Sequence, residues 1–427
     1  MNLQTLAARQ FGLRAHPLHA PPAQCLPLPA PGTITALLGD SGAGKSRALV
    51  AMALANPPAR TLTAPPDLPV PQLFDGLAPQ DALRTLAACG LADGRLWALR
   101  SSQLSAGEQQ RLALALALCG APPGTLLLAD EWDCHLDADS ARALAENLHR
   151  LARARQLRVV VTTHNPQRLP WLAPARVFRL AGRLQPVPVP APRHLADELT
   201  FTPGRLSDWA QFAPWHYLGT GRPGPTAAVW LARLHGQAVG LALFAFPLLL
   251  LGARRGVLPA SCETRQVLQQ GATELNRQVR ALSRIVVDPR LRGCGVAGRL
   301  LRFALPRLEV PFVECLAQMG EYSGFLHGAG FERAGTVAPP RAVLALRQFL
   351  ATRNLDAQAL LDPAARAQAC ADCPGLSAKL SALLKSRIET GHGSLRRGSG
   401  GDADAALTSA LSRLHAAPAY FLWRRHV

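Results

Sequence analysis

Short runs of consecutive apolar residues, each ending in polar or acidic positions, mark the first half of the chain. Residues 33–38, 125–130 and 158–163 form such runs. An unbroken apolar run of about 4–8 residues favours a strand that is buried on both faces, as in a parallel sheet covered by helices. The sequence RALVAMALA after the first run predicts a helix. We therefore expect an α/β fold for this half.

The second half has a less regular pattern. Residues 226–233 and 237–246 flank a short polar turn and predict a hairpin. Residues 283–288 and 312–316 predict two more strands, and the sequence RLLRFALPRL between them predicts a helix. This mixture favours an α+β domain.

Alternating prolines at residues 186–192 separate the two patterns. Proline lacks a backbone N–H and stiffens the chain, so we expect an extended linker there and no continuing strand or helix. The predicted organisation is a first domain at 1–185, a linker at 186–193, a second domain at 194–348 and a C-terminal extension at 349–427 with a Gly/Ser-rich loop at 390–404.

Composition excludes several classes of protein. The chain has 427 residues, 48% of them hydrophobic and 17% charged, which excludes a wholly disordered chain. Residues 238–252 are apolar but short for a membrane span of about 20 residues, and they contain Pro247, so buried strands explain them better. The first 25 residues contain no signal-peptide core, and the nine cysteines are an odd number. We therefore expect a cytoplasmic protein with reduced thiols and no membrane span.

Two features leave alternatives open. Cys370 and Cys373 form a single C-x-x-C pair, which fits an incidental pair or a zinc or redox site. The net charge is +18: residues 1–190 carry 18 basic and 12 acidic residues, and residues 191–427 carry 28 and 16. This excess makes nucleic acid a candidate partner, mainly for the second half, and a generally basic surface is the alternative.

A glycine-rich loop follows the first predicted strand and precedes the first predicted helix. It has the pattern G-x-x-x-x-G-K-S, in which backbone N–H groups surround phosphate oxygens, the lysine reaches the β- and γ-phosphates and the serine binds Mg²⁺. The candidate phosphate-binding residues are Gly39, Asp40, Ser41, Gly42, Ala43, Gly44, Lys45 and Ser46.

Polar residues also end the next two predicted strands. Asp130 and Glu131 follow residues 125–129, and His164 follows residues 158–163. Asp130 is a candidate Mg²⁺ ligand together with Ser46, Glu131 a candidate base for the attacking water, and His164 a candidate γ-phosphate contact. A surface turn is the alternative explanation of the paired acids.

The segment 104–111, LSAGEQQR, resembles the LSGGQ-x-QR signature of the ABC ATPase family, with Ala106 and Glu108 in place of Gly and Gln. The resemblance covers roughly residues 1–185. It implies ATP and Mg²⁺ as ligands, ATP hydrolysis, and a head-to-tail homodimer in which Ser105 and Gly107 contact the γ-phosphate in trans. It also implies a D-loop at His135-Leu136-Asp137 and a lid glutamine, Gln72, which acts with Glu131 and His164 in catalysis.

Two departures from that family are visible. Only 33 positions separate Gln72 from Ser105, so the helical subdomain, with which transporter ATPases contact their membrane subunits, is short. The aromatic residue expected to stack on adenine is not obvious, and Phe11 and His16 both remain candidates.

In the second half, residues 292–297 have the pattern R-x-x-G-x-A at a predicted helix start, which suits pyrophosphate binding. With the surrounding strands and the Gly330-Phe331 pair, residues 195–348 resemble the GNAT acyltransferase family. The resemblance implies acetyl-CoA as a ligand, bound by the loop and by the strand before it. The CoA-binding candidates are Val286, Val287, Arg292, Gly293, Cys294, Gly295, Val296 and Ala297.

The acyl-transfer chemistry is less defined. The position at which this family commonly has a tyrosine general acid is Leu326. Tyr322 or His327 are candidates instead, and Glu314 is a candidate base acting through water.

An aromatic-rich stretch at residues 208–217 fits simple hydrophobic packing or a stacking platform for a nucleic-acid acceptor. Arg254, Arg255, Arg284 and Arg290 are near enough in sequence to support the second explanation.

Together these features predict a soluble ABC-type ATPase whose ATP-driven closure gates acyl transfer from acyl-CoA to an unknown acceptor, with nucleic acid as the leading candidate. One alternative is the ATP-binding subunit of an ABC transporter. Another is an ATP-gated DNA clamp with an inactive acyl domain. The sequence identifies neither the acceptor nor the acyl group.

Overall fold

The computed structural model describes residues 26–134, 136–216, 223–320, 322–385, 403–411, 414 and 418–425. Phe11, His16, His135 and Tyr217 lie outside the described residues, as does most of the loop 390–404. The chain divides into two compact units, each made of two stretches of sequence. Unit 1 consists of Met1–Gly76 and Ala98–Leu195, and unit 2 of Leu77–Trp97 and Ala196–Val427.

Unit 1 is built on a six-stranded sheet with the order β2-β3-β4-β1-β5-β6, in which only β6 runs antiparallel to its neighbour. The strands are β1 (Thr33–Leu38), β2 (Arg60–Thr61), β3 (Leu126–Ala129), β4 (Arg158–Thr163), β5 (Arg176–Ala181) and β6 (Arg183–Val187). The α-helices are α2 (Lys45–Ala55), α5 (Ala106–Leu118), α6 (Ala138–Ala154) and α7 (Leu169–Leu172), and the 3₁₀ helices are η1 (Val70–Phe74), η2 (Ser101–Gln103) and η3 (Pro166–Arg168).

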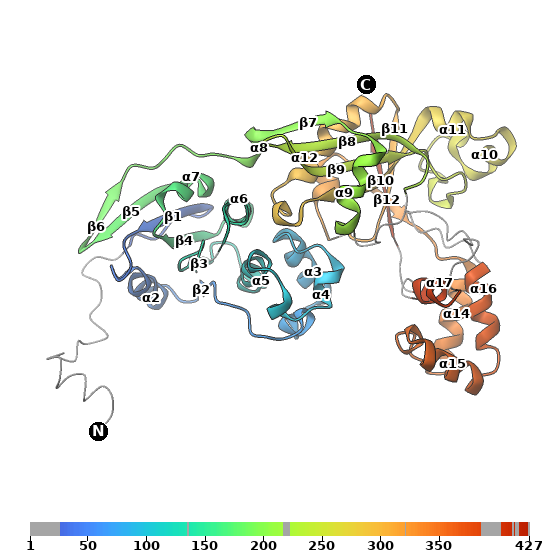
Figure 1. The fold of residues 1–427 in the computed structure, drawn as a ribbon, viewed down its shortest axis with the longest axis horizontal. Helices are drawn as coiled ribbons and strands as arrows, with labels where there is room; N and C mark the ends of the chain where they lie inside the picture. Colours follow the sequence, from blue (N-terminus) through green and yellow to red (C-terminus); the bar gives the residue numbers. More distant parts are fainter. Residues whose placement is uncertain are drawn as a thin grey trace. The chain divides into compact units, whose positions relative to one another are not determined.

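Helices cover both faces of this sheet. Figure 1 shows α2 on one side of it and α6 and α7 on the other. Leu37, Leu128 and Val160 of the central strands pack against α2 through a shared buried cluster. Burial on both faces explains why apolar residues occupy successive positions in these strands, and the three strands predicted from those runs are confirmed as β1, β3 and β4.

The expectation that the prolines end the sheet at residue 186 is wrong. β6 continues to Val187, and Pro186 pairs with Phe178 of β5. Because β6 is the edge strand of the sheet, the missing N–H of a proline costs no ladder hydrogen bond on the open side.

Unit 2 is built on a seven-stranded sheet with the order β12-β13-β11-β10-β9-β8-β7. Neighbouring strands are antiparallel except for β10 and β11, which are parallel. The strands are β7 (Leu199–Pro203), β8 (Thr226–Leu234), β9 (Gln237–Ala245), β10 (Val279–Val287), β11 (Phe312–Ala317), β12 (Glu332–Thr336) and β13 (Ala419–Arg424). The predicted hairpin is confirmed as β8 and β9.

Short helices surround this sheet. They are α3 (Pro79–Ala88), α4 (Gly94–Trp97), α9 (Trp209–Phe212), α10 (Thr264–Gln270), α11 (Thr273–Gln278), α12 (Val296–Ala304) and α13 (Phe325–Gly328), while α8 (Leu195–Glu198) begins at the unit boundary. The helix α12 packs on β8, β9 and β10. Among the helices of the described residues, none has both the length and the hydropathy needed to span a bilayer.

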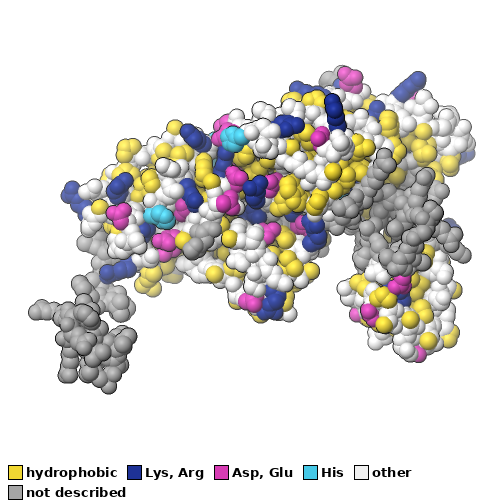
Figure 2. All heavy atoms as spheres, viewed as in Figure 1, with side chains coloured by type: hydrophobic (Ala, Val, Ile, Leu, Met, Phe, Trp, Pro, Cys, Tyr) yellow, Lys and Arg dark blue, Asp and Glu magenta, His cyan; other side chains and the backbone are white. Residues whose placement is uncertain are grey.

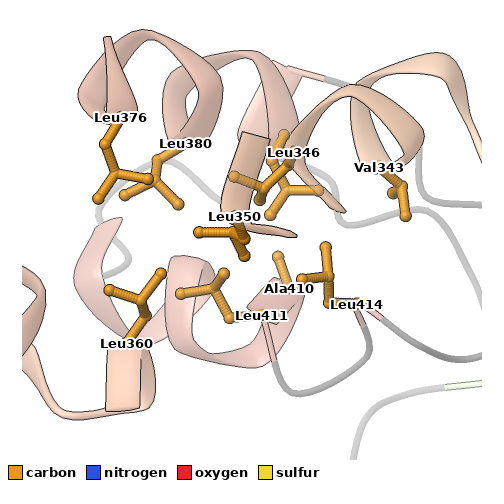
Figure 3. Packing of buried hydrophobic residues seen from close by; sticks show 10 residues of the cluster. Val343, Leu346, Leu350, Leu360, Leu376, Leu380, Ala410, Leu411 and Leu414 are labelled. Atoms are coloured by element: carbon orange, nitrogen blue, oxygen red, sulfur yellow. The ribbon is translucent and has the colours of Figure 1, made fainter. Parts of the chain in front are cut away.

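A group of helices lies in the chain between β12 and β13. It consists of α14 (Arg341–Thr352), α15 (Pro363–Asp372), α16 (Leu376–Lys385) and α17 (Ala403–Leu411). Figure 3 shows its leucine-rich interior, in which Leu346, Leu350, Leu380 and Leu411 point toward one another. Cys370 and Cys373 pack against this interior as half-buried residues. In the described part of the chain, no three His, Cys, Asp or Glu side chains are grouped as metal ligands.

The observed division differs from the predicted domains at two points. Residues 77–97 belong to unit 2 although they lie within the expected first domain, 1–185. The extension 349–427 is not separate, since its final segment, β13, is inserted between β11 and β12. Tyr420, Phe421 and Leu422 of this strand are fully buried. The consecutive large apolar side chains of β13 favour a place inside the sheet, where both faces are covered.

A buried ion pair links η6 (Gly252–Arg254) to the centre of the unit 2 sheet. Arg254 donates hydrogen bonds from Nε and Nη2 to the two carboxylate oxygens of Glu314, at 2.9 and 2.6 Å. Tyr420 of β13 donates a third hydrogen bond to the same carboxylate, at 3.2 Å. Arg254 is completely buried and Glu314 is 2% exposed, so each charge depends on the other for compensation.

We predict that Glu314→Gln lowers the free energy of unfolding by about 3–5 kcal/mol, because it leaves the buried Arg254 charge without its counter-ion. Glu332→Gln is the matched control. It removes the partner of Arg424 in an exposed ion pair, and its effect should stay below about 1 kcal/mol. Urea unfolding of both variants measures the difference, and equal effects would contradict the structural role of Glu314.

Candidate functional site

The loop between β1 and α2 has the geometry of an anion-binding loop. Gly44, the N-cap of α2, has φ 97°, which an L-residue rarely adopts. A Cβ atom on Gly39 would lie 2.9 Å from the carbonyl oxygen of Leu180 in β5, so a larger residue does not fit there. Within the described residues no side chain caps the start of α2 and no acid lies in its first turn. The first N–H groups of α2 are therefore available to a phosphate.

Lys45 lies inside this loop. It is 5% exposed, and its Nζ donates hydrogen bonds to the carbonyl oxygens of Gly39 and Asp40 at 2.8 and 3.0 Å. Ser46 beside it is exposed. A buried ammonium group, a helix start without a side-chain cap and an exposed hydroxyl would fit the phosphates of a nucleotide with Mg²⁺. Nucleotide binding by residues 39–46 stays a prediction.

The predicted acidic residues come to the same edge of the sheet as this loop. β3, β4 and β1 are adjacent and parallel, with Ala129 opposite Val161 and Leu38 opposite Thr163. Carboxyl ends of parallel strands meet at one edge. The phosphate loop, Asp130 and His164 therefore follow neighbouring strand ends, and both Asp130 and His164 are exposed.

Thr162, a residue that sequence reasoning missed, holds the two acids together. Its Oγ1 donates a hydrogen bond to Oδ1 of Asp130 at 2.6 Å and accepts one from the backbone N–H of Glu131 at 2.7 Å. Glu131 has φ 41°, a left-handed conformation that is unfavourable for a side chain of this type. Strain of this kind persists only where neighbouring contacts enforce it, and it occurs often at functional sites.

A second set of contacts fixes the expected D-loop. Asp133 is buried and accepts hydrogen bonds from Thr163 Oγ1 at 3.1 Å and from Arg168. Arg168 also donates to the carbonyl oxygens of Asp133 and Leu136, at 2.8 and 3.1 Å. The loop before α6 is thus tied to the segment after His164. Thr162 and Thr163 both carry hydroxyl groups at the end of an apolar strand. This pattern in the sequence could have indicated both sets of contacts.

The signature segment forms the start of α5. Ser105 is its N-cap, and Glu108 accepts hydrogen bonds from the backbone N–H and the hydroxyl of Ser105, at 2.9 and 2.8 Å. A Cβ atom on Gly107 would lie 3.3 Å from Oγ of Ser140, which in turn donates to Asp137, the N-cap of α6. The signature and the D-loop are therefore neighbours. Gln72 lies exposed in η1.

In unit 2 the predicted CoA loop also precedes a helix with an open start. Gly295 is the N-cap of α12, with φ 80° and no side-chain cap, and Gly293 has φ 85°. The pairing of β10 with β11 ends at Ala281, opposite Glu314. Val286 and Val287 therefore pair with β9 on one side but not with β11 on the other.

Arg292 of this loop is already engaged within unit 2. Its Nη1 donates to Oδ2 of Asp93 at 2.9 Å, and its Nη2 donates to the carbonyl oxygen of Trp215 at 3.0 Å. Asp93 also accepts hydrogen bonds from Arg95. Burial alone would raise the pKa of Asp93, but the hydrogen bonds from Arg95 and Arg292 outweigh it and lower that pKa to about 2.

The surroundings of Asp93 are strongly cationic. Buried His216 faces Arg284, Arg95 and Arg292, and burial together with these charges lowers its pKa to about 3. Neutral His216 therefore adds no charge near neutral pH. Three guanidinium groups and one carboxylate, that of Asp93, act on His216, and this excess of positive charge suits an anionic ligand.

The acyl-transfer candidates are not brought together by any contact that we identify among the described residues. Glu314 is buried, with both carboxylate oxygens bonded to Arg254. Tyr322 is half-buried just before α13, His327 is exposed, and Leu326 is buried. The tyrosine that does contact Glu314 is Tyr420, which sequence reasoning missed because it lies more than a hundred residues further along the chain.

The proposed nucleic-acid contacts of two arginines are wrong. Arg254 is fully buried and Arg284 is 5% exposed, so neither reaches a phosphate backbone. The aromatic stretch follows the packing explanation where it is described, since Trp209 and Phe212 lie in a buried cluster with β8 and β9. On the face in Figure 2, Lys and Arg side chains are dispersed among Asp and Glu side chains.

Comparison with known proteins bears on the first half of the chain. The family described as "AAA domain, putative AbiEii toxin, Type IV TA system" matches residues 69–168. The lipoprotein-releasing system ATP-binding protein LolD 1 of Rhodospirillum rubrum is 33% identical over 177 residues, covering 32% of this chain and 76% of the relative. LolD of Maricaulis maris is 32% identical over 221 residues, covering 42% and 85%.

Solved structures include the dimer of a bacterial ABC transporter cassette, with 22% identity, a TM-score of 0.32, and coverage of 38% of this chain and 88% of the other. The two LolD relatives are each more than 30% identical to this chain and are matched over more than two thirds of their length. The chain therefore belongs, through its ATP-binding part, to the ABC-type ATPases.

Proposed function

We propose that this protein hydrolyses ATP as a homodimer and uses the resulting cycle of closure and opening to control an acyl-CoA-dependent transfer reaction in unit 2. The observation that carries the ATPase part is the clamp of Asp130 and Glu131 by Thr162, which fixes both acids at the strand end next to the phosphate loop. The acyl-transfer part is a second candidate function, with separate support from unit 2.

In the ATPase cycle the chain supplies binding and positioning. The N–H groups at the start of α2 and the ammonium group of Lys45 hold the β- and γ-phosphates, so Lys45 must exchange its carbonyl partners for phosphate oxygens. Ser46 and Asp130 would hold Mg²⁺, which neutralises phosphate charge when it is bound. Glu131 orients the attacking water and accepts its proton, and His164 contacts the γ-phosphate.

The dimer completes this site. By the family resemblance, Ser105 and Gly107 of one copy face the γ-phosphate held by the other. The hydroxyl proton of Ser105 is bonded to Glu108, so it must be released before Ser105 donates to phosphate. Arg168 connects the segment after His164 to the D-loop by a hydrogen bond, and Gly107 of the signature lies close to Ser140, which is bonded to Asp137. These contacts support a coupled response of the elements to ATP.

The acyl-transfer proposal rests on three observations in unit 2. A single parallel strand pair lies inside an otherwise antiparallel sheet. That pair separates after Ala281, which leaves the β10 edge beside Val286 and Val287 free of β11 and available to a pantetheine arm. The open helix start at Gly295 follows directly and suits a pyrophosphate group.

A transporter subunit is the alternative that the relatives favour, since LolD proteins are named for a lipoprotein-releasing system. One structural observation weighs against it. Residues 77–97, from the region with which transporter ATPases contact membrane subunits, pack within unit 2 of this chain. Purification with a partner that contains membrane-spanning helices would favour the transporter.

The acceptor of the acyl group stays open. The net charge of +18 supports a nucleic-acid acceptor. Arg254 and Arg284 are buried, so these two residues do not add to that support. An ATP-gated clamp without acyl transfer differs from the main proposal by the absence of CoA binding.

Thr162→Val should lower kcat for ATP by roughly 10- to 100-fold, because hydrogen bonds to charged groups contribute about 1.5–3 kcal/mol and these hold Glu131 in place. The KM for ATP should change by less than about threefold, since the two hydrogen bonds of the Thr162 hydroxyl go to Asp130 and Glu131 and not to residues 39–46. Thr162→Ser retains the hydroxyl and is the control. Steady-state kinetics test this, and an unchanged kcat in the valine variant would contradict the clamp.

Glu131→Gln should retain ATP binding, abolish turnover and accumulate a dimer with ATP, because the amide cannot accept the proton of the attacking water. Size-exclusion chromatography with and without ATP measures the dimer. The double variant Lys45→Ala/Glu131→Gln is the control and should remain monomeric. A Glu131→Gln protein that binds ATP without dimerising would contradict the shared site.

Ala297→Glu should weaken CoA binding by about 100-fold, because it places a negative charge at the start of α12 where the pyrophosphate is expected. An acid in the first turn of a helix does not destabilise the helix, so unit 2 should remain folded. Ala297→Gln has the same size without the charge and should bind more tightly than the glutamate variant. Calorimetry with the full-length protein, with and without ATP, tests this, and a folded wild type that binds CoA in neither condition would refute the acyl-CoA proposal.

A further inference from the structure

The segment 77–97 belongs to one unit while both of its ends belong to the other. The chain leaves unit 1 after Gly76, forms α3 and α4 in unit 2, and returns to unit 1 at Ala98. We call residues 77–97 the inserted segment.

The two ends of the inserted segment are joined at their base in unit 1. The N–H of Val70 donates to the carbonyl oxygen of Leu99, and the N–H of Ser101 donates to that of Leu68, both at 3.0 Å. The hydroxyl of Ser101 donates to the carbonyl oxygen of Pro66 at 2.7 Å. The outgoing and returning chains therefore move together as one base.

This base adjoins two elements of the ATP site in sequence. Gln72 lies in η1, two residues after Val70, and Ser105 lies two residues after η2, which begins at Ser101. In the proposed ATP-bound dimer both residues approach the nucleotide. ATP binding therefore acts on the base from both sides, and the base passes any displacement to the inserted segment.

Residues 90–93 of the inserted segment contact the proposed CoA loop. Asp93 accepts the 2.9 Å hydrogen bond from Nη1 of Arg292, and Arg292 is only 17% exposed. Gly90 has φ 84°, and a Cβ atom there would lie 2.5 Å from the carbonyl oxygen of Arg292. The loop and the inserted segment thus fit together through their backbones as well as through an ion pair.

Asp93 and a pyrophosphate would compete for the same cation. A phosphate that binds at the start of α12 gains from the charge of Arg292, but Asp93 already accepts a hydrogen bond from Nη1 of that guanidinium group. The Asp93 carboxylate also repels a second anion close to it. Ligand binding at the loop is therefore weakened for as long as the inserted segment stays docked.

We propose that the inserted segment is a nucleotide-controlled latch, in which Asp93 holds Arg292 in the absence of ATP and ATP-driven dimer closure withdraws it, so that the loop 292–297 accepts the pyrophosphate of an acyl-CoA. The proposal rests on the acyl-CoA function of unit 2 proposed above. It adds that the ATPase regulates the step at which the CoA ligand binds.

Calorimetric titration of the full-length protein with CoA, in the absence of ATP, tests the competition. Asp93→Asn should bind CoA about 10-fold more tightly than the wild type, because one charge-assisted hydrogen bond no longer opposes the ligand. Asp81→Asn is the matched control. It removes an acid from the same segment, where Asp81 forms an exposed ion pair with Arg84, and should leave CoA affinity unchanged.

Gly90→Ala tests the same contact without altering any charge. The added methyl group meets the Arg292 carbonyl, so the inserted segment should dock less well and CoA should again bind more tightly. This variant keeps the test valid if Asp93→Asn fails to fold.

The outcomes separate the latch from the function on which it rests. If wild type, Asp93→Asn and Gly90→Ala bind CoA equally, the acyl-CoA function stands and the latch is wrong. If no folded form binds CoA, with or without ATP, the acyl-CoA function is wrong and the latch falls with it.

Hydrogen exchange in the Glu131→Gln protein tests the coupling to ATP independently of CoA. ATP should increase amide exchange in residues 77–97 and in the loop 290–297, because undocking exposes both to solvent. Unchanged exchange in both segments on ATP binding would overturn nucleotide control.

Discussion

The contact between Asp93 and Arg292 holds the inserted segment against the loop 292–297 within unit 2, and the proposed regulation depends on it. The residues on either side of this segment belong to unit 1, and the loop is the one for which we propose CoA binding. The low exposure of both side chains makes this ion pair less sensitive to salt than a surface pair. The backbone approach at Gly90 gives the contact a defined geometry.

In unit 1, a single hydroxyl group makes two hydrogen bonds that fix the acids at the strand end. Thr162 bonds the side chain of one acid and the backbone of the next, and the left-handed conformation of Glu131 is maintained by that contact. The next residue, Thr163, begins the separate set of bonds through Asp133 and Arg168 to the D-loop. Adjacent positions on one strand thus hold Glu131 and the loop before α6.

Sequence reasoning succeeded where structure depends on local pattern. The runs that became β1, β3 and β4 are buried on both faces, and the motif glycines report backbone conformations that other residues rarely adopt. It failed where distant segments meet. The pairing of Arg292 with Asp93 spans 199 positions, and the place of β13 depends on β11 and β12. In the sequence Arg254 has the pattern of a surface cation, because its partner Glu314 lies 60 positions further along the chain.

The division into units was misjudged for the same reason. Residues 77–97 have the composition of ordinary short helices, and nothing local distinguishes a helix that packs on its own domain from one that packs elsewhere. Pro186 was assigned to a linker because proline opposes strands, although an edge strand tolerates it.

The most direct test of the account is reciprocal binding. If ATP favours the undocked segment and CoA also requires it, then CoA must strengthen ATP binding by the same factor by which ATP strengthens CoA binding. The affinity of the Glu131→Gln protein for ATP, measured with and without saturating CoA, decides this without interference from turnover. The account predicts tighter ATP binding when CoA is present, and an ATP affinity that is the same with and without bound CoA would contradict it.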